Sequence, residues 1–258
     1  MEQNNIESSL NISDINSAFE QVISLNRLIG NRAVVEQLNI LVEQYFHDHQ
    51  LNKALPYPAI LIIGGKNSGR RTLARAICNS FCLPYRETIS KCLCMGGDSL
   101  DEFFLAGKEM CYHVSEAQDL SNYTQQAIHR LIYDKQLTVS SPIEKHSYTY
   151  PFRGLLILSA LETNNLAPQI IKDCTAVCRI KEYSIEERKA IVSQRFEFLG
   201  LKYDKEVLDA LTQIVDIAII MKSTELAYKV MATYGDTKIT SKHLKKAIHL
   251  LAASGYLA

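Results

Sequence analysis

The chain has 258 residues, of which 47% are hydrophobic, and its 28 basic and 28 acidic side chains give a formal net charge of zero. Such a composition is typical of a globular protein with one large core, or with one core and a small second domain. Nucleic-acid-binding proteins usually carry an excess of basic side chains, so the neutral average gives no support for a DNA-binding face. The longest apolar runs, residues 59–63 and 155–158, are too short to span a bilayer, and no membrane contact is expected.

Residues 1–24 are predicted to form an N-terminal arm. The segment is polar and acidic at its start and lacks the basic and then apolar order of a signal peptide, so we expect a cytoplasmic protein. Seven cysteines without a repeating frame argue against a disulfide scaffold. The cysteine pairs 78/82, 92/94 and 174/178 have no second pair of ligands that would complete a tetrahedral zinc site, so no metal site is predicted.

The first half of the chain alternates helical and strand signals. Apolar side chains at helical spacing predict an amphipathic helix over residues 31–46. The segment AILII, residues 59–63, is a short apolar run typical of a parallel strand that is covered on both faces. A helix is predicted over residues 70–81, a second buried strand over about 110–114, and a helix over 122–135.

The next segments complete an α/β domain. Two alternating stretches, residues 136–139 and 146–150, flank a Ser-Ser-Pro turn, which is the pattern of a β-hairpin. Further buried strands are predicted over 154–160 and 176–180. Strands that alternate with helices indicate a doubly wound parallel sheet, here over residues 25–183 with a hairpin inserted at about 136–150.

The pattern changes after Tyr183, where only helical segments are predicted. Ser184 and Glu187 have the spacing of a capping box, and Gly200 is expected to end the helix that they begin. Residues 184–258 are therefore predicted to form a small helical lid domain, with further helices that begin near Asp204, Ser223 and Thr240.

The stretch between the first strand and the next helix has the outline of a phosphate-binding loop. In G-x-x-x-x-G-K-S/T the backbone N–H groups surround the phosphates, the lysine reaches their oxygens and the hydroxyl binds Mg²⁺. Gly64 and Gly69 keep the spacing of the two glycines. Arg70 stands in place of the lysine, Arg71 in place of the hydroxyl, and Thr72 comes one residue late.

The order of these motifs resembles that of AAA+ ATPases, and most of all that of the RuvB family, which drives Holliday-junction branch migration. The resemblance runs from about Leu25 to Gly255. GGKNSGRRTLARAICN is similar to the family's GPPGLGKTTLAHIIAN. The segment LNRLIGNRAVVEQLNILVE resembles the family's opening element, whose Ile-Gly region contacts adenine, which implies a nucleotide contact at Leu28, Ile29 and Gly30.

Further along, the resemblance implies partner and DNA contacts. The predicted hairpin lies where the family inserts a hairpin that docks RuvA, so it is a candidate partner surface, although a solvated loop fits the pattern equally well. The family's winged-helix DNA-binding domain has no counterpart here. We therefore expect no direct contact with DNA.

The residues at the family's catalytic positions differ from its pattern. SEAQDL resembles DEIHRL, which places Ser115 at the metal-binding Asp and leaves Glu116 to orient water. NNLAPQIIKDC resembles the segment that ends in the arginine finger, with Asp173 in the arginine's register. Leu161 or Glu162 occupies the polar sensor position, and Lys222 is the one cation near the second sensor. No catalytic or metal-binding residue is therefore predicted; any nucleotide site is vestigial, formed by Gly64, Gly69, Arg70, Arg71, Thr72, Leu28 and Ile29.

These departures predict a pseudo-ATPase and leave three hypotheses. In the first, the chain is an inactive AAA+ domain that binds protein partners, by self-assembly or hetero-assembly, and Arg70, Arg71 and Arg75 either hold an acidic partner or phosphate or are solvated. In the second, it binds ATP or ADP without Mg²⁺ and without cleavage. In the third, it is an active DNA-remodelling ATPase or a DNA-binding accessory protein. The first is preferred, with no required cofactor.

Overall fold

The computed structural model describes residues 19, 21–51, 56–93, 100, 102–104, 108–140 and 147–255. Most of the predicted N-terminal arm, Cys94 and the turn of the predicted hairpin lie outside the described residues. The chain divides into two compact units. The core unit is Ile23–Glu182, and the helical unit is Tyr183–Ala258 with the segment that precedes Ile23.

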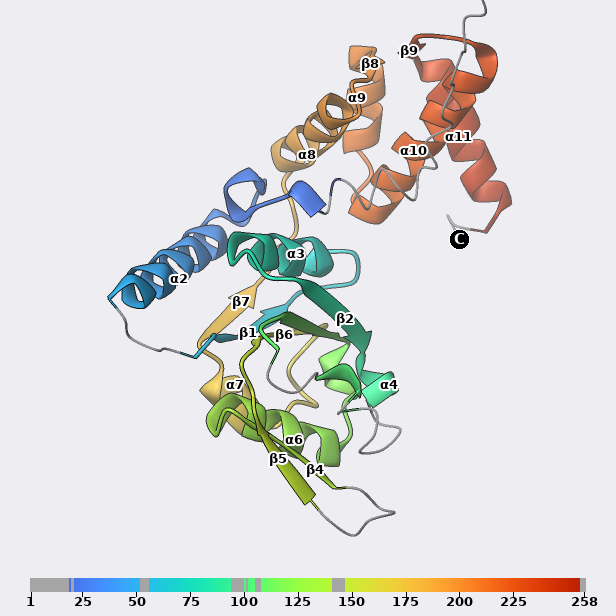
Figure 1. The fold of residues 1–258 in the computed structure, drawn as a ribbon. Coiled ribbons are helices and arrows are strands. Elements are labelled where there is room, and N and C mark those ends of the chain that lie inside the picture. Colours follow the sequence, from blue (N-terminus) through green and yellow to red (C-terminus); the bar gives the residue numbers. More distant parts are fainter. Residues whose placement is uncertain are drawn as a thin grey trace, which may run out of the picture. The chain divides into compact units, whose positions relative to one another are not determined.

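The core unit is built on a five-stranded parallel sheet with the strand order β2-β3-β6-β1-β7 (Figure 1). Strands β1, β3, β6 and β7 lie within one residue of their predicted positions, whereas β2 was not predicted. Because β1 pairs with β6 on one side and β7 on the other, the loop that follows β1 lies near the middle of the sheet. The strands are β1 Ala59–Ile63, β2 Tyr85–Ile89, β3 Cys111–Ser115, β6 Leu155–Ala160 and β7 Ala176–Arg179.

Helices cover both faces of this sheet. Figure 1 shows α3 on one face, and α6 with α7 on the other. Alternate residues of β1 face the two layers, and all five are buried, which explains why the strand is apolar throughout. The elements of the core unit outside its strands are η1 Leu25–Arg27, α2 Arg32–Gln50, α3 Arg70–Ser80, α4 Ser90–Leu93, η2 Ala117–Asp119, α6 Asn122–Tyr133 and α7 Pro168–Asp173.

The predicted hairpin is present as a separate two-stranded sheet. Strands β4, Gln136–Ser140, and β5, Ser147–Pro151, pair antiparallel. Thr138 and Thr149 lie opposite each other, with their hydroxyl oxygens 3.3 Å apart. The insertion before β6 is therefore an ordered ribbon at these residues.

Between residues 183 and 255, the helical unit has four helices and one short parallel ladder. The predicted capping box is confirmed, because Ser184 accepts from the backbone of Glu187 and the Glu187 carboxylate accepts from the backbone of Ser184. The predicted helix start near Ser223 is wrong: the helix begins at Ile217, since Asp216 caps it, and Ser223 is buried within it. The ladder was not anticipated from the sequence. The elements are α8 Ile185–Phe198, β8 Lys202–Tyr203, α9 Lys205–Thr212, α10 Ile217–Tyr234, β9 Lys238–Ile239 and α11 Ser241–Ala253.

In the described part of the chain, no helix combines the length and the apolar character that crossing a membrane requires.

Candidate functional site

The backbone turn between β1 and α3 is that of a tight glycine loop. The Gly64 N–H donates to the carbonyl of Ala160 at 3.1 Å, and the Ser68 N–H donates to the carbonyl of Gly65 at 3.3 Å. Gly69 precedes α3 with φ of 88°, a left-handed conformation that favours glycine. A Cβ on Gly64 would lie 2.5 Å from the Ser68 hydroxyl oxygen, so a larger residue fits there only if the Ser68 side chain shifts.

Arg70, in the lysine position of the loop, reaches the residue that follows β3. Its Nη2 lies 3.0 Å from Oε1 of Glu116, and the exposed fractions of the two side chains are 11% and 36%. The other carboxylate oxygen of Glu116 accepts from Nε2 of Gln118 at 2.8 Å. Both oxygens of the predicted water-orienting carboxylate are thus engaged by side chains of this chain.

Ser115, in the position of the metal-binding acid, points its hydroxyl at the neighbouring strand. The hydroxyl donates to the carbonyl of Thr88 at 3.1 Å. Thr72 is half-buried in the first turn of α3, one residue beyond the position that a metal-binding hydroxyl takes. Within the described ranges, no group of three or more His, Cys, Asp or Glu side chains is placed to hold a metal ion. These residues do not fit a Mg²⁺ site of the phosphate-loop kind, whose ligands are a carboxylate and a hydroxyl.

Arg71 and Arg75 occupy one face of α3, four residues apart, and both contact the edge strand β2. The Nε of Arg71 lies 2.9 Å from Oε2 of Glu87. The guanidinium carbon of Arg75 lies 3.6 Å from the centre of the Tyr85 ring, which is a cation–π contact. Both arginines are therefore engaged within the core unit.

A buried histidine on β3 extends this set of contacts into the sheet. Nδ1 of His113 lies 2.6 Å from the Tyr85 hydroxyl and 3.4 Å from Oε1 of Glu87, and its Nε2 lies 2.9 Å from the Ser159 hydroxyl. Burial opposes ionisation of Glu87 and raises its pKa. The hydrogen bond from His113 and the nearby positive charges, including those of Arg71 and Arg75, outweigh burial, so the pKa of Glu87 lies below its usual value. Ser159 is 2% exposed, so a substrate cannot reach it. The hydrogen-bonded set of Tyr85, Glu87, His113 and Ser159 is therefore structural.

The sequence analysis did not predict this hydrogen-bonded set. The signal that would have found it is the alternation within YRETI, residues 85–89, where Tyr85 and Glu87 share a face of β2.

The segment expected to contact adenine lies at the same edge of the sheet as the loop. Leu28 and Ile29 follow η1 and are half-buried. Just beyond them, Asn31 exchanges two hydrogen bonds with the backbone of Lys181, at 2.7 and 3.3 Å. Lys181 follows β7, and its neighbour Ile180 would touch a Cβ on Gly64 at 3.1 Å. The fold therefore brings this segment and the loop together.

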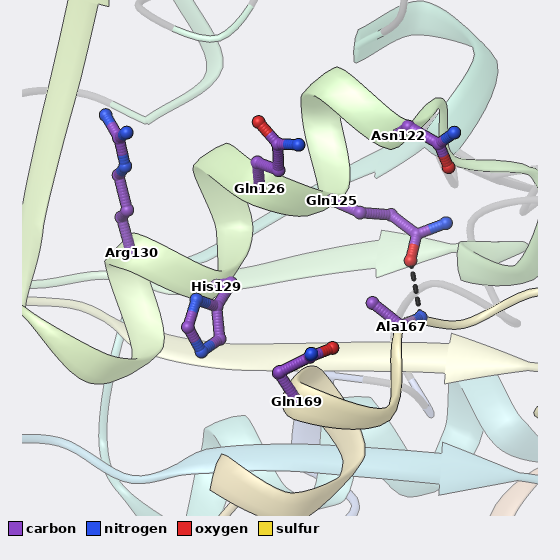
Figure 2. A pocket seen from close by; sticks show the side chains of 7 residues that line it. All are labelled: Asn122, Gln125, Gln126, His129, Arg130, Ala167 and Gln169. Carbon is purple, nitrogen blue, oxygen red and sulfur yellow. Dashed lines mark hydrogen bonds between the residues drawn. The ribbon is translucent and has the colours of Figure 1, made fainter.

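Asp173, in the register of the arginine finger, pairs with α6 instead. Its Oδ2 lies 2.9 Å from Nε2 of His129. A cavity of about 470 Å³ lies beside this pair, between α6 and α7, and Figure 2 shows Gln125 reaching from α6 to the backbone of Ala167. Asp173 comes shortly before β7, whereas the loop follows the end of β1. Because β1 and β7 are parallel, Asp173 lies at the amino ends of the strands and the loop at their carboxyl ends.

Both candidates for the first sensor position are exposed after β6. Leu161 is 41% exposed, and its N–H donates to Oε1 of Gln118 at 3.0 Å. The carboxylate of Glu162 accepts from Nδ2 of Asn164 at 3.0 Å. In the helical unit, Lys222 is exposed on α10.

No protein-family model matches the sequence, and no curated protein matches it. Solved structures of RuvB do match. The Thermotoga maritima RuvB Holliday junction branch migration motor has a TM-score of 0.72 at 14% identity, over 90% of this chain and 73% of that one. A lysine-to-arginine mutant of that RuvB matches with a TM-score of 0.73 at 15% identity, and an arginine-to-alanine mutant with a TM-score of 0.71 at 15% identity. Both matches cover 90% of this chain and 73% of the mutant's chain. The likeness confirms the expected architecture: this chain has a RuvB-like AAA+ fold.

Proposed function

We propose that the chain is a catalytically inactive RuvB-like AAA+ domain that acts as a protein-interaction or assembly subunit and does not hydrolyse ATP. The observation that carries this proposal is the ion pair between Arg70 and Glu116. A carboxylate that acts as a general base needs an oxygen free to contact the attacking water. Nη2 of Arg70 contacts one oxygen of Glu116 at 3.0 Å, and Nε2 of Gln118 donates to the other at 2.8 Å.

The residues around this pair also disfavour Mg²⁺. The Ser115 hydroxyl is neutral and donates to a backbone carbonyl, and Arg71 supplies a cation where the loop's hydroxyl would bind the metal. An arginine finger that reaches into a neighbouring subunit accelerates phosphoryl transfer by about 10³–10⁵. Asp173 stands in the register predicted for that arginine, and its negative charge would repel the phosphoryl group instead.

Apolar side chains at the same edge of the sheet support a role in protein contact. Ile89 at the end of β2 is 51% exposed, and Leu161 beyond β6 is 41% exposed. A contiguous exposed apolar surface favours burial against another protein, and in the sheet only β3 separates the two strands at whose ends these side chains lie. We place the partner surface here, and the partner is either a second copy of this chain or another protein.

The catalytic half of the proposal is tested by Mg²⁺-dependent ATP turnover, with and without DNA, in the wild-type chain and in Glu116→Gln. We expect both proteins to stay at background. Turnover by the wild-type chain that is lost in Glu116→Gln would overturn the proposal.

The interaction half is tested by light scattering over a range of concentrations and by capture of partners from the native cell. The double variant Ile89→Glu/Leu161→Glu should lose the complex, whereas Val215→Glu, at an exposed position of the helical unit, should retain it. If the double variant assembles and captures partners like the wild type, this edge is not the interface.

A second function, nucleotide binding without cleavage, is favoured by the loop itself. Gly64 and Gly69 keep the glycine spacing of a phosphate loop in a tight turn before α3, and Nη1 of Arg70 is buried with no hydrogen-bond partner among the described residues. Isothermal titration with ATP, with and without Mg²⁺, tests it. Affinity indifferent to Mg²⁺ supports this function, and absence of binding excludes it.

A further inference from the structure

A second concave site lies in the core unit at the edge of the sheet opposite to the glycine loop. It is a pocket of about 320 Å³ between the last turns of α2, the segment before β1, and the residues that open β4 and β7. Its volume is near the lower end of small-molecule sites, which span roughly 300–1,000 Å³. Pro58 lines it directly before β1, so a whole strand, roughly 17 Å long, separates it from the loop.

One wall of the pocket is aromatic and well ordered by its own contacts. The rings of Tyr45 and Tyr57 stack with centroids 4.8 Å apart and planes 22° from parallel. Phe81 packs edge-on against Tyr45 with centroids 5.3 Å apart. Because the two tyrosine rings are fixed before any ligand arrives, they offer a flat apolar surface at little entropic cost.

The pocket also contains a half-buried ammonium. Lys135 follows α6 with φ of 54°, a conformation uncommon for lysine, and its Nζ donates to the carbonyl of Tyr57 at 3.4 Å. Asp48 lines the same pocket but does not form an ion pair with Lys135, and no other carboxylate of the described residues lies within 4.0 Å of Nζ. Burial lowers the pKa of Lys135, which reflects the loss of water around the charge.

An ammonium has three N–H donors, and a neutral carbonyl satisfies one of them. A partly desolvated cation with one neutral partner gains most from an anion that enters the pocket, since a charge-assisted hydrogen bond is about twice as strong as a neutral one.

We propose that this pocket binds a small organic acid with a flat apolar body, whose carboxylate pairs with Lys135 and whose ring packs against Tyr45 and Tyr57. The site is independent of the nucleotide question, because it shares no residue with the loop or with the acids that follow β3.

The test uses the full chain and two matched probes, 1-naphthoate and the neutral 1-naphthamide, followed by NMR chemical-shift titration. We expect saturable binding of naphthoate with shifts at Tyr57 and Lys135, and weaker binding of the amide. Lys135→Met keeps the stem and removes the charge, and should weaken naphthoate binding about ten- to a hundred-fold. Lys108→Met removes an exposed lysine elsewhere in the core unit and should bind like the wild type.

A second variant fills the pocket without touching the cation. Gln44 lines the pocket from the exposed side of α2, so Gln44→Trp should abolish binding of both probes while the chain stays folded. The proposal is overturned if naphthoate shows no saturable binding at millimolar concentration, if acid and amide bind equally, or if Lys135→Met binds as well as Lys108→Met.

Discussion

The guanidinium of Arg71 and the carboxylate of Glu87 lie 2.9 Å apart and join the first turn of α3 to the edge strand β2. The other oxygen of Glu87 faces His113 at 3.4 Å. One carboxylate thus holds together a helix, an edge strand and the adjacent buried strand.

We expect Glu87→Gln to destabilise the chain by about 1–2 kcal/mol near neutral pH, since it removes the charge but keeps the shape. The folded pKa of Glu87 lies below its ordinary value of 4.5, so its contribution is complete above about pH 4.5 and is lost as pH falls through the folded pKa. Urea unfolding of wild type and variant at about pH 6 and about pH 3 measures this. The difference should shrink in acid, and Glu182→Gln, at an exposed glutamate, serves as the control for the loss of one surface carboxylate.

The ion pair between Arg70 and Glu116 is expected to couple the loop to β3. A double-mutant cycle with Arg70→Ala and Glu116→Ala should give a coupling free energy of about 1 kcal/mol, reduced from that of a buried pair because Glu116 is 36% exposed. Chemical denaturation of the four proteins provides the measurement. Strictly additive effects would show that the pair contributes nothing to the folded state.

Introducing the residues of a standard phosphate loop should create a response to magnesium. The triple variant Arg70→Lys/Arg71→Thr/Ser115→Asp supplies the compact cation, the hydroxyl and the metal-binding acid. We expect its affinity for ATP to rise at least about tenfold when Mg²⁺ is added, whereas the affinity of the wild type, if any, stays unchanged. Titration calorimetry decides the matter, and a folded triple variant that ignores Mg²⁺ would contradict this account of the site.

The cysteines should differ strongly in reactivity. Burial raises the pKa of both Cys174 and Cys178 to about 12, with the nearby charge of Asp173 adding to the effect at Cys174. Cys82 and Cys92 are exposed. Since the thiolate is the reactive form, brief alkylation near pH 8 followed by peptide mass spectrometry should label Cys82 and Cys92 first. Early labelling of Cys178 would mean that the sheet opens readily around β7.

The sequence was most informative where burial dictates composition. Strands β1 and β6 carry apolar runs because they are inner strands covered on both faces, and the glycine loop has a recognisable spacing. Strand β2 escaped prediction because it is an edge strand whose inward side chains are a tyrosine and a glutamate. The start of α10 was misplaced because Ser223 has the chemistry of a cap but is buried in the helix, while Asp216 is the cap.

At the candidate site, the sequence identified which residues stand in the motif positions but not what they contact. Arg70 pairs with a residue 46 positions away and Arg71 with one on an unpredicted strand. Such pairings depend on the side-chain directions that result from packing between α3 and the sheet. The spacing of residues along the chain does not predict these directions. The aromatic pocket beside Lys135 was missed for the same reason, since it joins four separate segments.

The crowding at Gly64 limits which side chains this position can hold. A Cβ there would lie 2.5 Å from the Ser68 hydroxyl oxygen and 3.1 Å from Cβ of Ile180, so a larger residue needs both neighbours to shift whether or not a phosphate is ever bound. This requirement belongs to the shape of the turn and is separate from the ion pairs of Arg70 and Arg71. A glycine at this position is therefore informative about the turn and uninformative about ATP turnover.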